Sequence, residues 1–324
     1  MGLYRPRAMT FMRISGVALS KGRQLILFLA VIACAVHSVQ ADDAEIATFN
    51  ISSYASRPNG SYLLVFPTNS RSFSISLPAV LRRVVYGADG RSLYAEAAGR
   101  PGITRIDFNP LRLTALPGSD KFVVLRGFAV SKGGDKALIS GRRSDLTNTC
   151  GIFELNLATG LLRPVFAGPD CRAGSPWRVL DLSSDGTEAL IRDADGRVDS
   201  LHLASGSLTA LDKEAWLASY SPDGKWIAEL WLGGPHTPSK TVLVDRSDLT
   251  RRRDLGGVND DEVVWSPDSR TILHAVPRPT CSSQNPVAIE ELDAITGARS
   301  IAENTACQAG ASRMIGWLSS LVHE

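Results

Sequence analysis

The sequence predicts an all-β fold, and within that class a six-bladed β-propeller, from three observations. A turn signature recurs along the chain, and its clearest copy is Ser221-Pro222-Asp223-Gly224, with an apolar run on each side. Short strands separated by turn residues come in groups of four, about every 35 to 50 residues, which is the period of propeller blades. After the N-terminal segment the chain shows no long helical pattern.

The recurring corner has the chemistry of a tight turn between two strands. Pro222 presets φ, Asp223 can accept backbone N–H groups, and Gly224 tolerates a positive φ without steric cost. Similar corners, each leading into a further apolar run, occupy 86–91, 130–136, 182–187 and 265–270.

A second turn signal recurs in register with the first. It has the form Leu155-Asn156-Leu157-Ala158-Thr159-Gly160, and related segments occupy 201–206 and 292–297. The three glycines are separated by one period of about 46 residues and then by two, as expected for repeated blades. A fourth segment, at 244–248, lacks the glycine. Five four-stranded units are therefore predicted to start near residues 84, 128, 178, 216 and 262.

The two ends of the repeat region complement each other. Three strands are predicted first, at 46–52, 62–66 and 73–77, and an isolated strand is predicted last, at 314–318. We expect the C-terminal strand to join the N-terminal three-stranded blade, because closure removes the two free sheet edges of an open ring. The alternative is an unclosed stack of sheets.

The corners Ser221-Pro222-Asp223-Gly224-Lys225-Trp226-Ile227 and Trp265-Ser266-Pro267-Asp268-Ser269-Arg270 resemble the WD40-like repeats of TolB-type periplasmic propellers. The resemblance extends over about residues 84 to 320, and two units match it better than the other three. It implies blade architecture, in a family that includes scaffolds, receptors and propellers attached to enzymes.

The N-terminal segment has the layout of a signal peptide. Five basic residues and no acidic residue precede an apolar run at 25–36, which is shorter than the roughly twenty residues that span a membrane. We predict a signal peptide at 1–41, cleaved after Ala41, and a single domain at 42–324 that is periplasmic or secreted. Two alternatives stay open: a membrane-anchoring N-terminal helix, and a lipoprotein attached through Cys34. If the leader is cleaved, membrane contact is expected only when Cys34 is lipidated. Translation could also start at Met9 or Met12.

Charge argues against nucleic-acid binding. The whole chain has a net charge of +2, but removal of 1–41 leaves 30 basic and 33 acidic residues, a net charge of −3. No basic face with interleaved aromatic residues remains.

We expect a monomer whose partner is a protein of the cell envelope.

Four cysteines follow the leader, an even number in an exported chain, where disulfides persist. Four cysteines allow three pairings. Cys150 precedes a predicted third strand and Cys171 follows the fourth, while Cys281 and Cys307 have the same places in a later unit. Adjacent ends of an antiparallel hairpin favour Cys150 with Cys171 and Cys281 with Cys307.

Motifs for catalysis and metal binding are not found. The chain after the leader has no G-x-S-x-G elbow, H-E-x-x-H helix or phosphate loop. Its histidines do not share a loop, and neither cysteine pair has zinc-ligand spacing. We therefore predict no catalytic residues, no cofactor and no metal.

The links between second and third strands differ most from unit to unit. Those at 141–149, 233–240 and 277–286 are long and polar. Variable loops on a rigid scaffold commonly carry binding specificity. The candidate binding residues are Arg142, Arg143, His236, Lys240 and Arg278.

The leading hypothesis is a non-catalytic protein-binding or scaffold module of the bacterial envelope. The alternative is a small-ligand or carbohydrate receptor, or an enzyme, that uses the central channel.

Overall fold

The computed structural model describes residues 49–57, 60–66, 73–87, 90–144, 150–167, 177–211, 215–233, 239–258, 263–277, 287–302 and 314–319. By its internal contacts the chain divides into two units, Met1–Ile46 and Ala47–Glu324. Every described residue belongs to the second unit. No helix in these described ranges has the length and apolarity needed to cross a membrane.

The described strands form six four-stranded antiparallel sheets. In spatial order, the first contains β24 (Met314–Ser319), β1 (Phe49–Arg57), β2 (Gly60–Phe66) and β3 (Phe73–Leu77). The second contains β4 (Leu81–Tyr86), β5 (Ser92–Ala97), β6 (Ile103–Phe108) and β7 (Leu111–Ala115). A short 3₁₀ helix, η1 (Ser119–Lys121), leads into the third, which contains β8 (Phe122–Val130), β9 (Lys136–Arg143), β10 (Cys150–Asn156) and β11 (Leu162–Ala167).

The remaining three sheets repeat this order along the chain. The fourth contains β12 (Arg178–Leu182), β13 (Glu188–Arg192), β14 (Val198–His202) and β15 (Leu208–Ala210). The fifth contains β16 (Ala215–Tyr220), β17 (Trp226–Trp231), β18 (Ser239–Asp245) and β19 (Asp248–Val258). The sixth contains β20 (Val264–Trp265), β21 (Thr271–Pro277), β22 (Val287–Asp293) and β23 (Arg299–Ile301).

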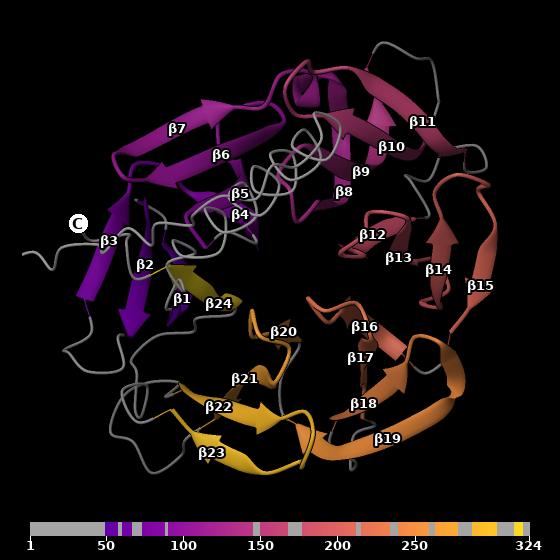
Figure 1. Cartoon of the computed structure of the whole chain (residues 1–324). Coiled ribbons are helices and arrows are strands. Elements are labelled where there is room, and N and C mark those ends of the chain that lie inside the picture. The colour runs from indigo at the N-terminus through magenta and orange to yellow at the C-terminus, as the bar shows by residue number, and fades with distance from the viewer. Residues whose placement is uncertain are drawn as a thin grey trace, which may run out of the picture. The chain divides into compact units, whose positions relative to one another are not determined.

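The sheets succeed one another around a common centre (Figure 1). One edge strand of each sheet, β4, β8, β12, β16, β20 or β24, lies on the inner side, and we name these six the inner strands. This arrangement confirms the predicted all-β propeller. The predicted junction of the chain ends is also present, because β24 pairs with β1 through Ile51↔Trp317 and neighbouring pairs. Strand β1 extends to Arg57, beyond the predicted end at residue 52, because its hairpin with β2 continues to the Arg57↔Gly60 pair.

The predicted corner chemistry is confirmed at Ser221-Pro222-Asp223-Gly224. Gly224 has φ 72°, and its N–H donates to the carbonyl of Ser221 at 2.8 Å. The Oδ1 of Asp223 accepts the N–H of Lys225 at 3.1 Å and the hydroxyl of Ser221 at 2.6 Å. In the 265–270 corner, Ser269 takes the glycine position with φ 63°. Its hydroxyl accepts the N–H of Asp223 at 2.9 Å, so the serine side chain also links two sheets.

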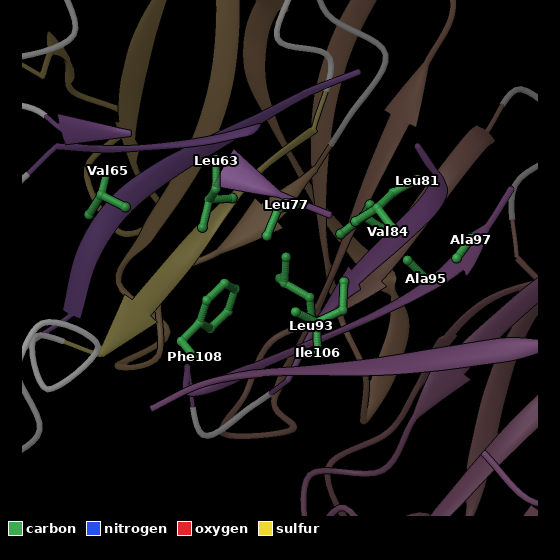
Figure 2. Packing of buried hydrophobic residues seen from close by; sticks show 10 residues of the cluster. All are labelled: Leu63, Val65, Leu77, Leu81, Val84, Leu93, Ala95, Ala97, Ile106 and Phe108. Atoms are coloured by element: carbon green, nitrogen blue, oxygen red, sulfur yellow. The ribbon is translucent and has the colours of Figure 1, made fainter. Parts of the chain in front are cut away.

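Apolar side chains fill the spaces between adjacent sheets. Figure 2 shows one such cluster, in which Leu63 of β2 and Leu77 of β3 meet Leu93 of β5 and Ile106 of β6. Leu63, Leu93 and Ile106 are fully buried. Burial of a side chain of this size stabilises the fold by about 2 kcal/mol, so each sheet depends on its neighbours for a core.

Two glycines set how closely the inner strands approach. A Cβ built at Gly127 of β8 would lie 2.4 Å from the carbonyl oxygen of Val179 in β12. A Cβ at Gly316 of β24 would lie 2.4 Å from the ring of Tyr86 in β4. Real Cβ atoms do not approach other heavy atoms so closely. Glycine at these two places therefore lets neighbouring inner strands surround a narrow central space.

Candidate functional site: the central cavity and its basic face

The inner strands surround a cavity of about 610 Å³. One end lies where inner strands begin and is lined by Arg83, Arg178 and Leu217. The other end lies at the corners that follow these strands and includes Lys132 and Pro222. This volume is in the usual range for small-molecule sites, roughly 300 to 1,000 Å³.

Two arginines stand at the end where the strands begin. Arg83 is the extra residue of a bulge in β4 and has φ 43°, a backbone conformation that side-chain-bearing residues rarely adopt. Its guanidinium donates to the carbonyl of Leu125 in the next sheet and forms a 3.5 Å ion pair with Glu96. Arg178, the first residue of β12, is exposed and forms no hydrogen bond or ion pair within the described ranges.

Positive charge is concentrated around Arg178. Partial desolvation by the surrounding protein lowers the pKa of Arg178, and repulsion from Arg192 and then from Arg83 lowers it further. Arg192 is the residue that faces Arg178 across the β12–β13 pair. The positive charges of Arg192 and Arg83 therefore both act on the guanidinium of Arg178.

Among the described residues that line the cavity, Asp181 is the acidic one. Its Oδ2 accepts the hydroxyl of Ser219 at 2.7 Å and the N–H of Tyr220 at 2.8 Å, and its Oδ1 accepts the N–H of Leu182 at 2.7 Å. Burial raises the pKa of Asp181, although these hydrogen bonds oppose the rise. The carboxylate thus links β12 to β16 and forms no ion pair with Arg178.

An arginine and a tryptophan from adjacent sheets stack at the same end of the propeller. The guanidinium carbon of Arg192 lies 3.9 Å from the centroid of the Trp216 ring, and its Nη1 donates to the Trp216 carbonyl at 3.1 Å. Trp216 is the bulge residue near the start of β16 and is 39% exposed.

We name this end of the propeller, where inner strands begin and second strands end, the basic face. Its defining residues are Val123, Arg142, Arg143, Arg178, Arg192, Trp216, Leu232 and Lys240. Val123 and Leu232 add exposed apolar side chains to it, 59% and 45% exposed.

Three of the predicted binding residues lie on this basic face. Arg142 and Arg143 end β9, and Lys240 lies opposite Trp231 across the β17–β18 hairpin. Arg142 forms no ion pair or hydrogen bond with the described part of the chain, whereas the guanidinium of Arg143 lies 5.3 Å from the Phe153 ring. Lys240 is 3.3 Å from Asp254 and 4.2 Å from the Trp231 ring, so its charge is already neutralised. His236 and Arg278 lie outside the described residues.

The described histidines have different environments. His274, on β21, is fully buried, and its Nε2 lies 3.3 Å from the hydroxyl of Thr241. His202 ends β14, is exposed, and lies 2.9 Å from the hydroxyl of Ser205. Within the described ranges no group of three or more His, Cys, Asp or Glu side chains is arranged to hold a metal ion.

The predicted disulfides stay predictions. Cys150 begins β10, is 2% exposed, and faces Arg142 across the β9–β10 pair. Its predicted partner Cys171 lies outside the described residues, as do Cys281 and Cys307.

Sequence reasoning did not single out Arg83, Arg178, Arg192 or Trp216. A signal for Arg83, Arg178 and Trp216 was present, because each stands at or near the start of a predicted four-stranded unit. The register that brings Arg178 opposite Arg192, and the bulge that exposes Trp216, depend on pairing between strands. Neither follows from the local pattern of apolar residues.

The fold and the cavity define a β-propeller. Comparison with solved structures shows which propellers it is similar to. No protein-family model and no curated protein sequence matches this chain. TolB from Acinetobacter baumannii is similar in structure, with a TM-score of 0.61 and 15% identity over 93% of this chain and 74% of that chain. A putative TolB from Agrobacterium tumefaciens gives a TM-score of 0.57 and 15% identity over 79% of this chain and 88% of that chain.

Enzymes share the architecture as well. An oligogalacturonate lyase from Vibrio parahaemolyticus gives a TM-score of 0.52 and 9% identity over 74% of this chain and 70% of that chain. At these identities the similarity shows the fold alone. The chain has a β-propeller fold of the TolB type.

Proposed function

We propose that this chain is a non-catalytic binding module that holds a protein partner of the cell envelope on its basic face. The observation that carries the proposal is the stacked pair Arg192–Trp216, which lies beside Arg178, an arginine that forms no ion pair in the described ranges. Arginine and tryptophan are enriched among the residues that dominate binding energy at protein interfaces. A rigid propeller presents them at low cost in conformational entropy.

The charges of the basic face indicate what it binds. Arg142 and Arg178 have no ion pair within the described ranges, and Arg192 stacks on an exposed ring. Exposed apolar side chains at Val123, Trp216 and Leu232 lie at the same end. An acidic segment of a partner that also carries apolar residues complements both features, and charge complementarity favours fast and selective association.

Two further features belong to the proposal. The six four-stranded sheets and the pairing of β24 with β1 support one closed six-bladed ring in which the first and last described strands share a sheet. The basic and apolar N-terminal segment supports export, with cleavage after Ala41 and attachment through Cys34 as the alternative. Fractionation of the source cells, with N-terminal sequencing and mass measurement of the exported protein, distinguishes these two processing routes.

The interaction is tested in two stages. Partners are first cross-linked to the full chain and captured from the envelope fraction. The dissociation constant of a purified partner is then measured at two salt concentrations. Arg142→Gln with Arg143→Gln is compared with Arg112→Gln with Arg163→Gln. The second pair removes the same charge from strands β7 and β11.

The proposal predicts that the first pair of substitutions weakens binding at least tenfold and reduces its dependence on salt, while the second pair leaves both unchanged. Trp216→Ala should weaken binding to a similar extent. Equal effects of the two double variants, or no effect of Trp216→Ala, would exclude the basic face as the binding surface.

A further inference from the structure

The central cavity shares Arg178 with the basic face, but it adds apolar walls that the proposed protein interface does not use. Its walls are largely apolar, and several of the apolar side chains that line it are only partly buried. These are Leu180, Leu217, Val264 and Trp317. Sites with mostly apolar walls and a few well-placed polar groups are typical of small-molecule binding.

The charged groups among the described lining residues are predominantly basic. Arg83, Arg178 and Lys132 line the cavity together with one acidic residue of the described ranges, Asp181. The carboxylate of Asp181 already accepts three hydrogen bonds, from Ser219, Tyr220 and Leu182. The positive charge at the end that holds Arg83 and Arg178 is therefore not balanced by the cavity's own acidic group.

Arg178 is the arginine whose donors are available. The guanidinium of Arg83 is used by the Leu125 carbonyl and by Glu96. Arg178 has no such partner in the described part of the chain. The aliphatic part of the Arg178 side chain lies against the backbone of Gly127 in the neighbouring sheet. A Cβ built on Gly127 would lie 3.0 Å from the Cγ of Arg178. This close approach restricts the base of the Arg178 side chain, a residue that lines the cavity.

We propose that the central cavity binds an organic carboxylate, with its carboxylate on the guanidinium of Arg178 and its apolar body along Leu217, Val264 and Trp317. A guanidinium presents two parallel N–H donors that match the two oxygens of a carboxylate. The nearby charges of Arg83 and Arg192 attract the same anion. Binding a carboxylate also relieves the repulsion among the arginines, which is one cause of the lowered pKa of Arg178.

The test uses 4-phenylbutanoate as the probe and 4-phenylbutan-1-ol as its neutral counterpart with the same apolar body. Binding of each to the full chain is measured by isothermal titration calorimetry in buffer of low salt. Tryptophan fluorescence provides a second signal, because Trp265 and Trp317 line the cavity. Inorganic phosphate is titrated separately, to distinguish an organic anion from any small anion.

The proposal predicts that the carboxylate binds at least tenfold more tightly than the alcohol and more tightly than phosphate. Arg178→Gln should remove most of this preference, and Arg178→Lys should retain part of it, since lysine keeps the charge but not the paired donors. Arg112→Gln on β7 makes the same change of charge away from the cavity and should have no effect. Circular dichroism and a thermal melt establish that each variant is folded.

Three results would each overturn the proposal: no binding of 4-phenylbutanoate to the folded wild-type chain, equal binding of acid and alcohol, or an unchanged affinity in Arg178→Gln. Phosphate binding as tight as that of 4-phenylbutanoate would exclude the role of the apolar wall. The result for the cavity can be distinguished from the result for the protein interface by one double variant. Arg142→Gln with Arg143→Gln should weaken partner binding and leave the affinity for 4-phenylbutanoate unchanged.

Discussion

The guanidinium carbon of Arg192 lies 3.9 Å from the centroid of the Trp216 ring, while Nη1 of the same arginine donates to the Trp216 carbonyl at 3.1 Å. One side chain thus holds the end of β13 against the start of β16 in the next sheet. The stack orders a partly exposed arginine and an exposed tryptophan before any partner arrives. This preorganisation lowers the entropy lost on binding.

A double-mutant cycle measures the stack directly. We expect Arg192→Ala and Trp216→Ala each to lower the free energy of unfolding by about 1 kcal/mol, with a coupling of roughly 0.5 to 1 kcal/mol between them, the usual strength of an exposed cation–π pair. The measurement is urea unfolding of the wild-type chain, the two single variants and the double variant. Strict additivity of the two substitutions would show that the ring and the charge do not interact in solution.

Gly127 should be intolerant of any side chain. In Gly127→Ala the new Cβ meets the Val179 carbonyl at 2.4 Å, so β8 and β12 must separate. Overpacking of this kind costs about 1 to 3 kcal/mol, and each kcal/mol lowers the melting temperature by about 2 to 4 °C in a domain of this size.

Gly133→Ala is the matched control for this substitution. Its Cβ would have its nearest contact at 3.4 Å, with a side-chain oxygen of Asp135. Differential scanning calorimetry of both variants tests the argument. A Gly127→Ala protein as stable as Gly133→Ala would mean that the inner strands can separate without cost.

Asp185 should make folding sensitive to acid. Burial by itself would raise the pKa of Asp185, but hydrogen bonds from Thr187, Ser183 and Arg246 outweigh burial and hold that pKa well below its ordinary value. In the unfolded chain the pKa of this carboxyl is about 4. Because the pKa is lower in the folded state, Asp185 stabilises the fold at any pH above about 4. This stabilisation is lost as the pH falls below about 4 toward the pKa of the folded state.

Asp185→Asn should therefore be less stable than the wild-type chain at pH 7, by about 1 kcal/mol, and the difference should narrow below pH 4. Urea unfolding from pH 7 down to pH 2.5 measures both effects. The control is Asp120→Asn, which alters an exposed carboxylate with no hydrogen bond or ion pair in the described ranges. A gap between wild type and Asp185→Asn that does not change with pH would contradict the assignment.

The predicted pairing of the cysteines can be tested by comparing the protein with and without a reducing agent. If Cys150 pairs with Cys171 and Cys281 with Cys307, peptide mapping without reduction should recover these two cross-linked pairs and no others. Cys150→Ser with Cys171→Ser should lower stability by about 2 to 4 kcal/mol. Reductant should then destabilise this variant less than the wild-type chain. Recovery of Cys150 linked to Cys281 or Cys307 would contradict the hairpin argument.

The repeat, the corners and the pairing of the last strand with the first group could all be predicted from the sequence. The corners and strands are local features, since the Asp223-Gly224 corner carries its own hydrogen bonds and positive φ, and an apolar run bounded by turn residues indicates a strand without reference to its neighbours. The sequence shows an isolated strand at 314–318 and a group of only three strands at the N-terminus. We could predict that they pair, because unpaired sheet edges are unfavourable.

The tertiary structure alone decided which charges come together. The sequence placed Arg142 and Arg143 on a variable link, but only the register of β12 with β13 brings Arg178 opposite Arg192, and only contact between sheets brings Arg192 onto Trp216 and Arg83 onto the Leu125 carbonyl. Such contacts join residues far apart in the chain. They depend on bulges and on the close approach at Gly127, which change side-chain direction without changing the local pattern of apolar and polar residues.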